Sequence, residues 1–348
     1  MNPHILAVLV SSLGLGTILT FSSSHWLMAW MGLEINTLAI APLMAQHHHP
    51  RAIEATTKYF LTQATAAAMI LFASTTNAWT TGEWDINDLS SPLAATMFTT
   101  ALALKIGLAP MHFWMPEVLQ GLDLTAGLIM STWQKLAPFA LMIQTSQMIN
   151  PTLLTALGVT STLVGGWGGL NQTQLRKILA YSSIAHMGWM VVVIQYTPQL
   201  AILALGTYII MTSTAFLTLK TSMVTKTSTL AMAWPKGPIV MGTAMLALLS
   251  LGGLPPLTGF MPKWLILQEL TKQDMPIIAT TMALAALISL YFYLRLCYAM
   301  TLTTYPATTN ILTSWRTQTT QTSLMLTISM TMTLGLLPVT PTVLMLTI

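Results

Sequence analysis

Long apolar segments follow one another along almost the whole chain, separated by short polar connections that contain Pro and Gly. Stretches without Asp, Glu, Lys or Arg cover residues 1–33, 59–82, 136–175, 178–219, 237–262 and 317–348. A helix that crosses a lipid bilayer needs roughly 20 apolar residues, so several stretches hold one or two such helices. The pattern predicts about eleven spans, near 3–22, 25–45, 57–78, 93–117, 122–144, 151–170, 177–196, 199–221, 238–268, 275–298 and 322–344.

The composition supports a membrane protein and excludes several other classes. Hydrophobic residues make up 54% of the 348 residues and charged residues only 6%, against roughly 25% charged in soluble domains. So few charges cannot cover a soluble surface, which excludes an ordinary soluble enzyme, a disordered chain and a nucleic-acid binder. The connections near 79–92 and 299–321 are too short to fold as separate domains. A single cysteine, Cys297, excludes a disulfide framework and a Cys-based metal or iron–sulfur site.

The distribution of charges predicts the orientation of the spans. The basic residues on or near the side of the N-terminus are Arg51, Lys58, Arg176, Lys177, Lys220, Lys226, Lys236, Arg295 and Arg316. The opposite side carries the acidic connection Glu83, Asp85, Asp88 and a mixed one with Glu269, Lys272 and Asp274. The positive-inside rule therefore places the N-terminus in the cytoplasm or the mitochondrial matrix, and an odd number of spans places the C-terminus opposite.

The N-terminal segment and the residue usage favour a mitochondrial origin. Residues 1–22 lack the basic flank of a signal peptide and the Arg-rich pattern of a transit peptide, so we expect no cleavable segment. Met makes up 26 of 348 residues, and Thr is also abundant. This usage without a presequence is typical of a protein made inside a mitochondrion.

Ionisable residues within the predicted spans are the candidate functional residues. Glu34, Lys105 and Lys135 lie mid-span, and Lys263 follows a Gly- and Pro-containing interruption. A charge at membrane depth is costly and usually marks an ion or proton path. Lysine suits proton transfer because burial disfavours its charged form and a nearby carboxylate favours it. The alternative for each residue is an interfacial position or a structural ion pair.

Histidines and further charges have weaker assignments. His112 and His186 lie in or at the edge of spans, where neutral imidazole can pass a proton, or they are hydrogen-bonded packing residues. The triplet His47, His48, His49 is too local to supply convergent metal ligands, so we expect no metal site. Glu54 and Lys58 have the spacing of an i,i+4 ion pair at a helix end. We interpret Glu117 and Asp123 as loop charges.

An internal repeat links two interrupted spans. The segment GLAPMHFWMPE at 107–117 aligns without a gap with GLPPLTGFMPK at 253–263, matching in Gly, Leu, Pro, Met and Pro. Pro removes a helix hydrogen bond, so both spans should break, around residues 108–110 and 254–256. The copies are five spans apart and therefore have opposite orientations. Paired broken helices in inverted repeats indicate an ion path.

The repeat predicts the architecture. The fold class is all-α: a polytopic membrane protein with two inverted five-helix repeats, each with a broken helix, and one extra C-terminal helix. The whole chain forms a single transmembrane domain, with the first repeat at 1–146, the second at 147–298, and a connecting loop and C-terminal helix at 299–348.

Five motifs together resemble one family. GLEINTLAIAPLM, LAPMHFWMPEVLQGL, STWQKLAPF, LAYSSIAHMGWM and LGGLPPLTGFMPKW are similar to segments of NADH dehydrogenase subunit 2 of animal mitochondria, an antiporter-like subunit of respiratory complex I. The resemblance covers essentially the whole chain. It implies that Glu34 belongs to the first half-channel and that Lys105 is its partner on the broken helix. It implies that Lys135 is the central connecting lysine and that Lys263 is the lysine of the second broken helix.

The resemblance also implies partners and cofactors. His112 and His186 would line the connection between the half-channels. The partners would be the other membrane subunits of complex I, namely a neighbouring antiporter-like subunit, the small polar-axis subunits and accessory subunits. Bacterial relatives carry three more N-terminal helices, and another subunit or lipid would fill the groove left by their absence; phospholipid such as cardiolipin would be a further partner. The chain itself would bind no cofactor, whereas the whole complex would use NADH, FMN, iron–sulfur clusters and ubiquinone in the mitochondrial inner membrane.

The resemblance and the buried ionisable residues favour a proton-translocating subunit of NADH:ubiquinone oxidoreductase, and two other functions remain open. A stand-alone cation/proton antiporter would have a related fold, but the chain lacks a multi-carboxylate sodium site. A purely structural membrane subunit would not need four ionisable residues at membrane depth. The chain has no dinucleotide-binding glycine motif, and it lacks the HExxH, GxSxG and paired-aspartate signatures of intramembrane hydrolases.

Overall fold

The computed structural model describes residues 2–46, 48–234, 237–301 and 324–347, and regular secondary structure in these ranges is helical. Lys236 and Arg316, which the sequence places on the N-terminal side, lie outside the described residues, as does most of the connection at 299–321. The helices are α1 (Pro3–Ser22), α2 (Trp26–Met44), α3 (Pro50–Thr81), α4 (Pro92–Ile106), α5 (Trp114–Gly121), α6 (Leu124–Gln144), α7 (Pro151–Gly169), α8 (Leu175–Val193), α9 (Pro198–Ser222), α10 (Thr227–Ala231), α11 (Pro238–Gly252), α12 (Phe260–Lys272), α13 (Pro276–Thr301), α14 (Leu324–Gly335) and α15 (Thr340–Thr347).

The predicted all-helical polytopic membrane fold is confirmed. Four of the helices, α1, α2, α9 and α13, have 19 to 26 residues and are apolar enough to cross a membrane by length and composition. Apolar side chains such as Val8, Ile18 and Leu284 point outwards and are more than 60% exposed. An exposed surface of this kind suits contact with lipid or with other membrane proteins.

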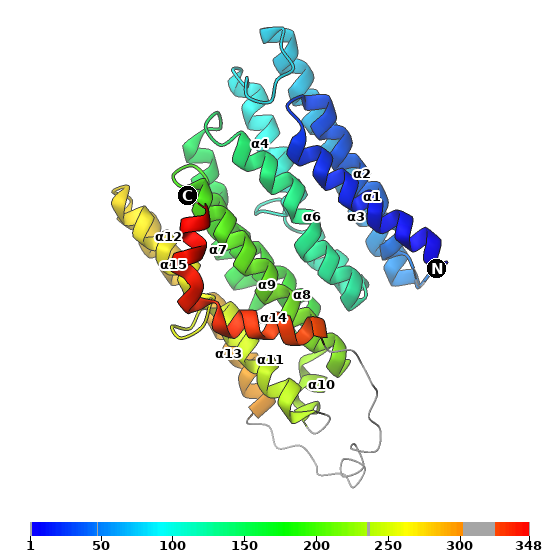
Figure 1. The fold of residues 1–348 in the computed structure, drawn as a ribbon, viewed down its shortest axis with the longest axis vertical. Coiled ribbons are helices and arrows are strands. Elements are labelled where there is room, and N and C mark those ends of the chain that lie inside the picture. Colours follow the sequence, from blue (N-terminus) through cyan, green and yellow to red (C-terminus); the bar gives the residue numbers. More distant parts are fainter. Residues whose placement is uncertain (1, 47, 235–236, 302–323, 348) are drawn as a thin grey trace. The chain divides into compact units, whose positions relative to one another are not determined.

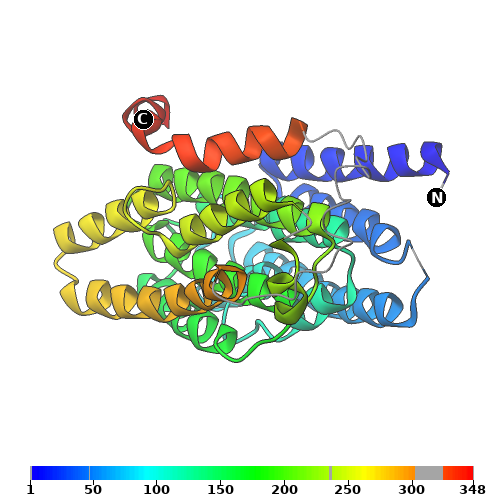
Figure 2. The ribbon, with the colours of Figure 1, turned by 90° about the horizontal axis from the view of Figure 1, so that it is seen from below.

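The chain forms two units, residues 1–161 with 187–198, and residues 162–186 with 199–348. In the first unit α1 packs along α2, α2 along α3, and α3 along α4 and α5, while α6 contacts α1, α2 and α4 (Figure 1). In the second unit α13 packs against α10, α11 and α12, and α14 against α11. Figure 2 shows α12 and α13 as neighbouring antiparallel helices joined by a short turn. The division into repeats at residue 146 stays a prediction.

Both predicted interruptions are confirmed, and they share one backbone geometry. Helix α4 ends at Gly107 (φ 83°, ψ 43°) and α11 ends at Gly253 (φ 82°, ψ 42°). In each case the glycine and the following leucine donate their N–H groups back to the last helical turn: Leu108 to Ala103 at 2.9 Å and Leu254 to Leu249 at 3.4 Å. This is the glycine-dependent Schellman ending of a helix. Each span resumes seven residues after its glycine, at Trp114 of α5 and Phe260 of α12.

The last predicted span differs from the structure. The sequence predicts one helix near 322–344, but α14 ends at Gly335 and a 3-10 turn, Leu337–Val339, separates it from α15. Pro338 lies within that turn. Proline cannot donate the backbone hydrogen bond that a continuous helix needs there, which explains the break. The short helix α10 was also not predicted from the sequence.

Helices α1 and α2 are in very close contact at two glycines. A Cβ atom added at Gly16 would lie 2.9 Å from the Gly32 carbonyl oxygen, and one added at Gly32 would lie 2.8 Å from the Gly16 carbonyl oxygen. Small residues allow this kind of backbone approach between membrane helices. The pair therefore fixes the position of α2, which carries Glu34, against α1.

We expect Gly32→Ala to destabilise the first unit by about 1–3 kcal/mol, because the added methyl group overpacks a backbone contact. The amount of full-length chain recovered in membranes after a thermal challenge measures this effect. Gly14→Ala is the matched control, since Gly14 lies on the facing helix α1 and a Cβ added there meets nothing within 4 Å. Equal recovery of the two variants would contradict the role assigned to the close contact.

Candidate functional site

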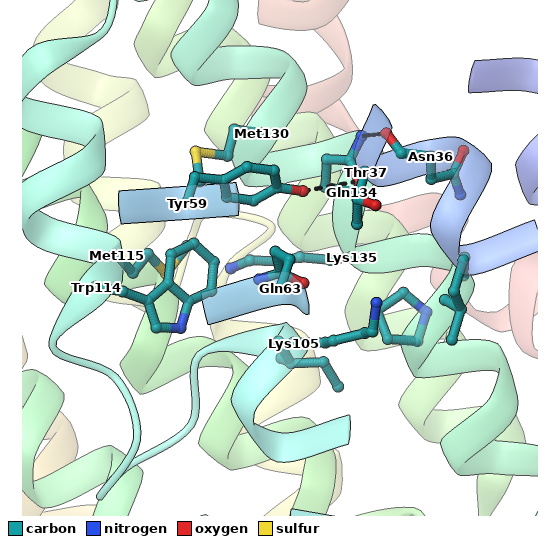
Figure 3. Close-up of a pocket in the computed structure, with 14 residues that line it drawn as sticks. Asn36, Thr37, Tyr59, Gln63, Lys105, Trp114, Met115, Met130, Gln134 and Lys135 are labelled. Carbon is teal, nitrogen blue, oxygen red and sulfur yellow. Dashed lines mark hydrogen bonds between the residues drawn. The ribbon is translucent and has the colours of Figure 1, made fainter. Parts of the chain in front are cut away.

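A small buried cavity lies in the first unit, where α2, α3, α4, α5 and α6 meet. Its lining residues are Leu33, Asn36, Thr37, Tyr59, Gln63, Lys105, Ile106, Trp114, Met115, Met130, Gln134, Lys135, Ala137 and Pro138. Figure 3 shows Lys105, Lys135 and Gln63 grouped around the same space. The cavity volume is about 20 Å³, which is enough to hold one water molecule. Two lysines that are 30 residues apart in the sequence therefore share one polar cavity.

Neutral polar side chains connect the helices around the cavity. The Tyr59 hydroxyl donates to Gln134 Oε1 at 3.4 Å, and Gln134 Nε2 donates to the Asn36 backbone carbonyl at 3.3 Å. These contacts join α3 to α6 and α6 to α2. The Trp114 indole N–H donates to the Leu104 carbonyl at 3.0 Å, so α5 is tied to the end of α4 across the interruption.

Several buried polar atoms at this site have no hydrogen-bond partner among the described residues. They are Lys105 Nζ, Gln63 Nε2, Glu34 Oε2 and both side-chain polar atoms of Asn36. Leaving such atoms without a partner costs about 1–3 kcal/mol each, so buried polar atoms in proteins are normally satisfied by protein groups or water. The lining thus has the polarity, and the cavity has the volume, that a bound water molecule requires.

Glu34 lies on α2 between the lining residues Leu33 and Asn36 and is not itself part of the lining. Its carboxyl oxygen Oε2 is buried, and its charge acts on both Lys105 and Tyr59. The structure records no N···O distance of 4.0 Å or less between the described side chains of Glu34 and Lys105. The two groups therefore interact through space without a direct ion pair.

Lys135 lies on α6, which continues through the site to Gln144. Its side chain is 2% exposed and lines the cavity together with Pro138. Because Pro138 has no N–H group, the Gln134 carbonyl does not receive the usual helix hydrogen bond. On α6, Lys135 therefore adjoins the Gln134 carbonyl, which lacks its usual helix hydrogen bond.

The two broken helices carry their lysines at different repeat positions. Lys105 lies in the last turn of α4, two residues before Gly107. Lys263 lies ten residues after Gly253, on α12, and its Nζ donates to the Gly252 carbonyl at 2.8 Å and to the Leu251 carbonyl at 3.5 Å. The Lys263 ammonium therefore lies at the C-terminal end of α11, and Lys105 belongs to the last turn of α4; at both helix ends the helix dipole stabilises positive charge.

The two histidines occupy different settings. His112 is buried in the interruption between α4 and α5, with its ring 4.4 Å from that of Phe113. His186 lies on α8, and its Nδ1 donates to the Ser182 carbonyl at 2.7 Å. Glu34, Lys105, Lys135 and His112 belong to the first unit, and His186 and Lys263 to the second.

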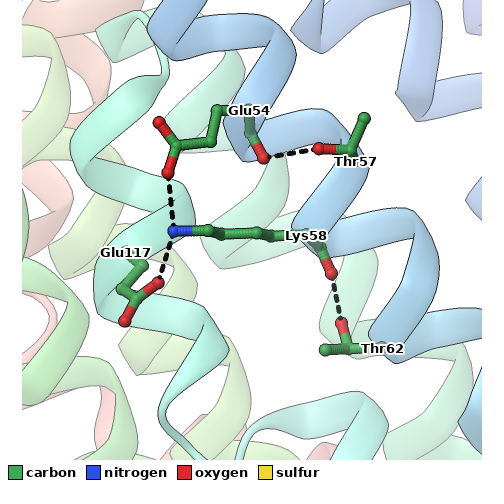
Figure 4. Close-up of polar contacts among 5 residues, drawn as sticks. All are labelled: Glu54, Thr57, Lys58, Thr62 and Glu117. Carbon is green, nitrogen blue, oxygen red and sulfur yellow. Dashed lines mark hydrogen bonds and ion pairs between the residues drawn. The ribbon is translucent and has the colours of Figure 1, made fainter.

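The predicted pair of Glu54 and Lys58 is confirmed, but the interpretation of Glu117 as a loop charge is wrong. Lys58 Nζ lies 2.8 Å from Glu54 Oε1 and 2.8 Å from Glu117 Oε2, and Glu117 is on α5 (Figure 4). Glu117 is the repeat equivalent of Lys263, so the two repeats carry opposite charges at this position. All three side chains are more than 40% exposed, and such pairs contribute roughly 0–1 kcal/mol.

The sequence reasoning missed the neutral lining of the cavity. Asn36, Gln63 and Gln134 are amides within three mostly apolar spans, and Tyr59 precedes Gln63 by one helical turn. The sequence does contain a signal for these residues, because amide side chains at membrane depth also need polar partners. Among the described residues, no three His, Cys, Asp or Glu side chains are grouped as metal ligands.

Comparisons with known proteins show which family the chain belongs to. Residues 23–289 match the family described as NADH:quinone oxidoreductase/Mrp antiporter, TM, and residues 290–344 match the family described as NADH dehydrogenase subunit 2 C-terminus. The chain belongs to the NADH dehydrogenase subunit 2 family. Its relatives include the NADH-ubiquinone oxidoreductase chain 2 proteins of Carassius auratus, with 81% identity, and Danio rerio, with 72% identity. Each of these matches covers all of both chains.

Solved structures show the same fold. A chain of respiratory complex I from Thermus thermophilus with bound Aureothin matches with a TM-score of 0.84 and 29% identity, over 97% of this chain and 78% of that one. A chain of the Mrp complex from Dietzia sp. matches with a TM-score of 0.79 and 14% identity, over 97% of this chain and 76% of that one. The second likeness shows the fold alone.

Proposed function

We propose that this subunit 2 family member is a proton-translocating core subunit in the membrane arm of NADH:ubiquinone oxidoreductase, respiratory complex I. The observation that carries the proposal is the buried cavity in which Lys105 and Lys135 meet at an interrupted helix. The chain acts as part of an oxidoreductase. We propose that it binds no cofactor itself and that the FMN, the iron–sulfur clusters and the sites for NADH and ubiquinone lie in other subunits.

The proposed path begins at Glu34 and Lys105. A negative Glu34 favours the ammonium form of Lys105, and a shift of the broken helix changes this interaction, because α4 ends at a glycine two residues beyond Lys105. Water in the shared cavity then passes a proton between Lys105 and Lys135. His112, His186 and Lys263 continue the path. Electron transfer elsewhere in the complex supplies the energy through neighbouring subunits.

We place the chain in the mitochondrial inner membrane as a multi-pass subunit. Because the basic residues gather on one side, we propose that the N-terminus lies in the matrix and the C-terminus in the intermembrane space. The acidic connection between α3 and α4 lies on the intermembrane side, and there the hydrogen bond and the negative charge of Asp88 raise the pKa of Glu83. From the residue usage we further propose that the chain is encoded in the mitochondrion.

The proposed partners are other membrane subunits of complex I, accessory subunits and phospholipid such as cardiolipin. One feature that supports a lipid partner is an open apolar groove of about 520 Å³ between α2 and α3. Its lining residues are Leu38, Ala41, Pro42, Ala45, Thr56, Thr57, Phe60 and Leu61. Arg51 lies on α3 five residues before Thr56, where its charge suits a phosphate headgroup.

Purification from membranes tests the proposed function. The chain should co-migrate with a large complex that oxidises NADH and reduces ubiquinone, and its depletion should remove proton pumping from that complex. A stand-alone cation/proton antiporter would instead migrate apart from NADH oxidation and exchange cations in vesicles. A purely structural subunit would co-migrate, but substitution of its buried lysines would leave pumping unchanged.

A further inference from the structure

A cluster of buried polar side chains lies in the second unit, on α8, α9 and α13. The members other than His186 are Ser182, Ser183, Tyr208 and Tyr293, which are all 1% exposed or less. Neither carboxylates nor lysines belong to the cluster. The proposed path assigns a role only to His186 here. The two serines donate to carbonyls of their own helix at 2.8 Å and 2.6 Å. The buried Tyr293 hydroxyl is the group that needs an explanation of its own, since burying a hydroxyl group is unfavourable unless it is used or satisfied.

The cluster holds the His186 imidazole in one orientation. His186 Nδ1 donates to the Ser182 carbonyl at 2.7 Å, so in the neutral ring Nε2 carries the lone pair that accepts a proton. The ring of Tyr208 lies with its centroid 5.7 Å from that of His186. The Tyr208 hydroxyl is in turn hydrogen-bonded to the side chain of Ser183, the residue after Ser182.

Tyr293 approaches the same serine pair from α13. Its hydroxyl lies near the Ser182 side chain, but it makes no hydrogen bond of 3.5 Å or less to any described residue. The Ser182 hydroxyl is itself engaged with the Leu179 carbonyl at 2.8 Å. A buried phenol without a close partner can both accept and donate a proton, which is the requirement for a relay.

The same tyrosine lies beside the group that holds Lys263. Lys263 Nζ donates to the Gly252 carbonyl at 2.8 Å. A Cβ atom added at Gly252 would lie 3.6 Å from Tyr293 Cδ2, which is ordinary van der Waals contact. The Tyr293 ring thus lies beside the end of the broken helix α11. Its hydroxyl lies near the side chain of Ser182, the residue whose backbone carbonyl accepts from His186.

We propose that Tyr293 is the proton-relay residue between Lys263 and His186, an inference that rests on the proposed function. The Lys263 ammonium gives up a proton, Tyr293 Oη takes up a proton, and the original Tyr293 hydroxyl proton moves on past Ser182 to His186. The N–H bond at Lys263 breaks and an N–H bond at His186 forms. Tyr293 ends neutral, and one positive charge has moved from the lysine to the imidazole.

Tyr293→Phe tests this role in the assembled complex, because it removes the hydroxyl group and keeps the ring against Gly252. We expect coupled turnover per assembled complex to fall about a hundredfold and its solvent deuterium isotope effect to rise, because proton transfer becomes limiting. Tyr291→Phe is the matched control: it lies two residues away on α13, and its side chain is 59% exposed. That variant should behave as the wild type.

Ser182→Ala is the second variant, and it keeps the test decisive if Tyr293→Phe assembles poorly. It should also raise the isotope effect, and the double variant should be no slower than the slower single variant. A loss of assembled complex with unchanged turnover and isotope effect in the remainder would overturn the relay and leave Tyr293 as a packing residue. If Tyr293→Phe had normal turnover while Lys135→Met had low turnover, the relay would be wrong and the proposed function would stand. Normal turnover in both would overturn the proposed function as well.

Discussion

Replacing Lys135 with Met is expected to lower coupled ubiquinone reduction and proton pumping by about a hundredfold, the scale of a lost acid–base group. Assembly should be retained. The Lys135 side chain is 2% exposed, and methionine has a similar length without the cost of burying a charge. Helix α6 should also keep its shape, because its course through Pro138 to Gln144 does not depend on the lysine head group.

The measurement compares assembled complex on native gels with inhibitor-sensitive NADH:ubiquinone turnover and with pumping in sealed vesicles. Lys272→Met is the control for the same chemical change, since the Lys272 side chain is 61% exposed at the end of α12. It should leave all three quantities unchanged. Full turnover with full pumping in Lys135→Met would remove Lys135 from the proton path.

The interruptions show what the sequence can predict. Gly107 and Gly253 are each followed by prolines within three residues, and these residue types act through the backbone alone. The break could therefore be located without any knowledge of the neighbouring helices. The repeat alignment added the expectation that the two breaks share a geometry, and their φ and ψ values agree within a few degrees.

The side-chain partners were less predictable for a physical reason. The alignment pairs Lys263 with Glu117, but the sequence does not show that Lys263 folds back onto the end of α11 while Glu117 reaches Lys58 on α3. Those contacts depend on helix packing, which is set by residues far apart in the chain. In the same way, charge-free spans were identified by the absence of ionisable residues, and this criterion overlooks amides such as Gln63 and Gln134.

Glu34 and Lys105 pose the sharpest test of the mechanism. Both carry a buried polar atom without a protein hydrogen bond, and they interact electrostatically without a direct ion pair. An isolated charge at this depth would be strongly unfavourable, so each group determines whether the other can stay charged. The position of Lys105, two residues before a left-handed glycine, allows a small shift of the broken helix to change their separation.

We therefore expect strong non-additivity between Glu34→Gln and Lys105→Met. Each single change should lower the protons pumped per NADH oxidised, and the double variant should be no worse than the poorer single variant, because the second change removes a group that has already lost its partner. The exposed pair of Glu54 and Lys58, with an N···O distance of 2.8 Å, provides a control cycle with Glu54→Gln and Lys58→Met. That cycle should show little effect on pumping, although its ion pair is closer, because solvent-exposed charges are screened. If the losses at Glu34 and Lys105 were strictly additive, the two residues would act independently, and Glu34 would need another partner in the path.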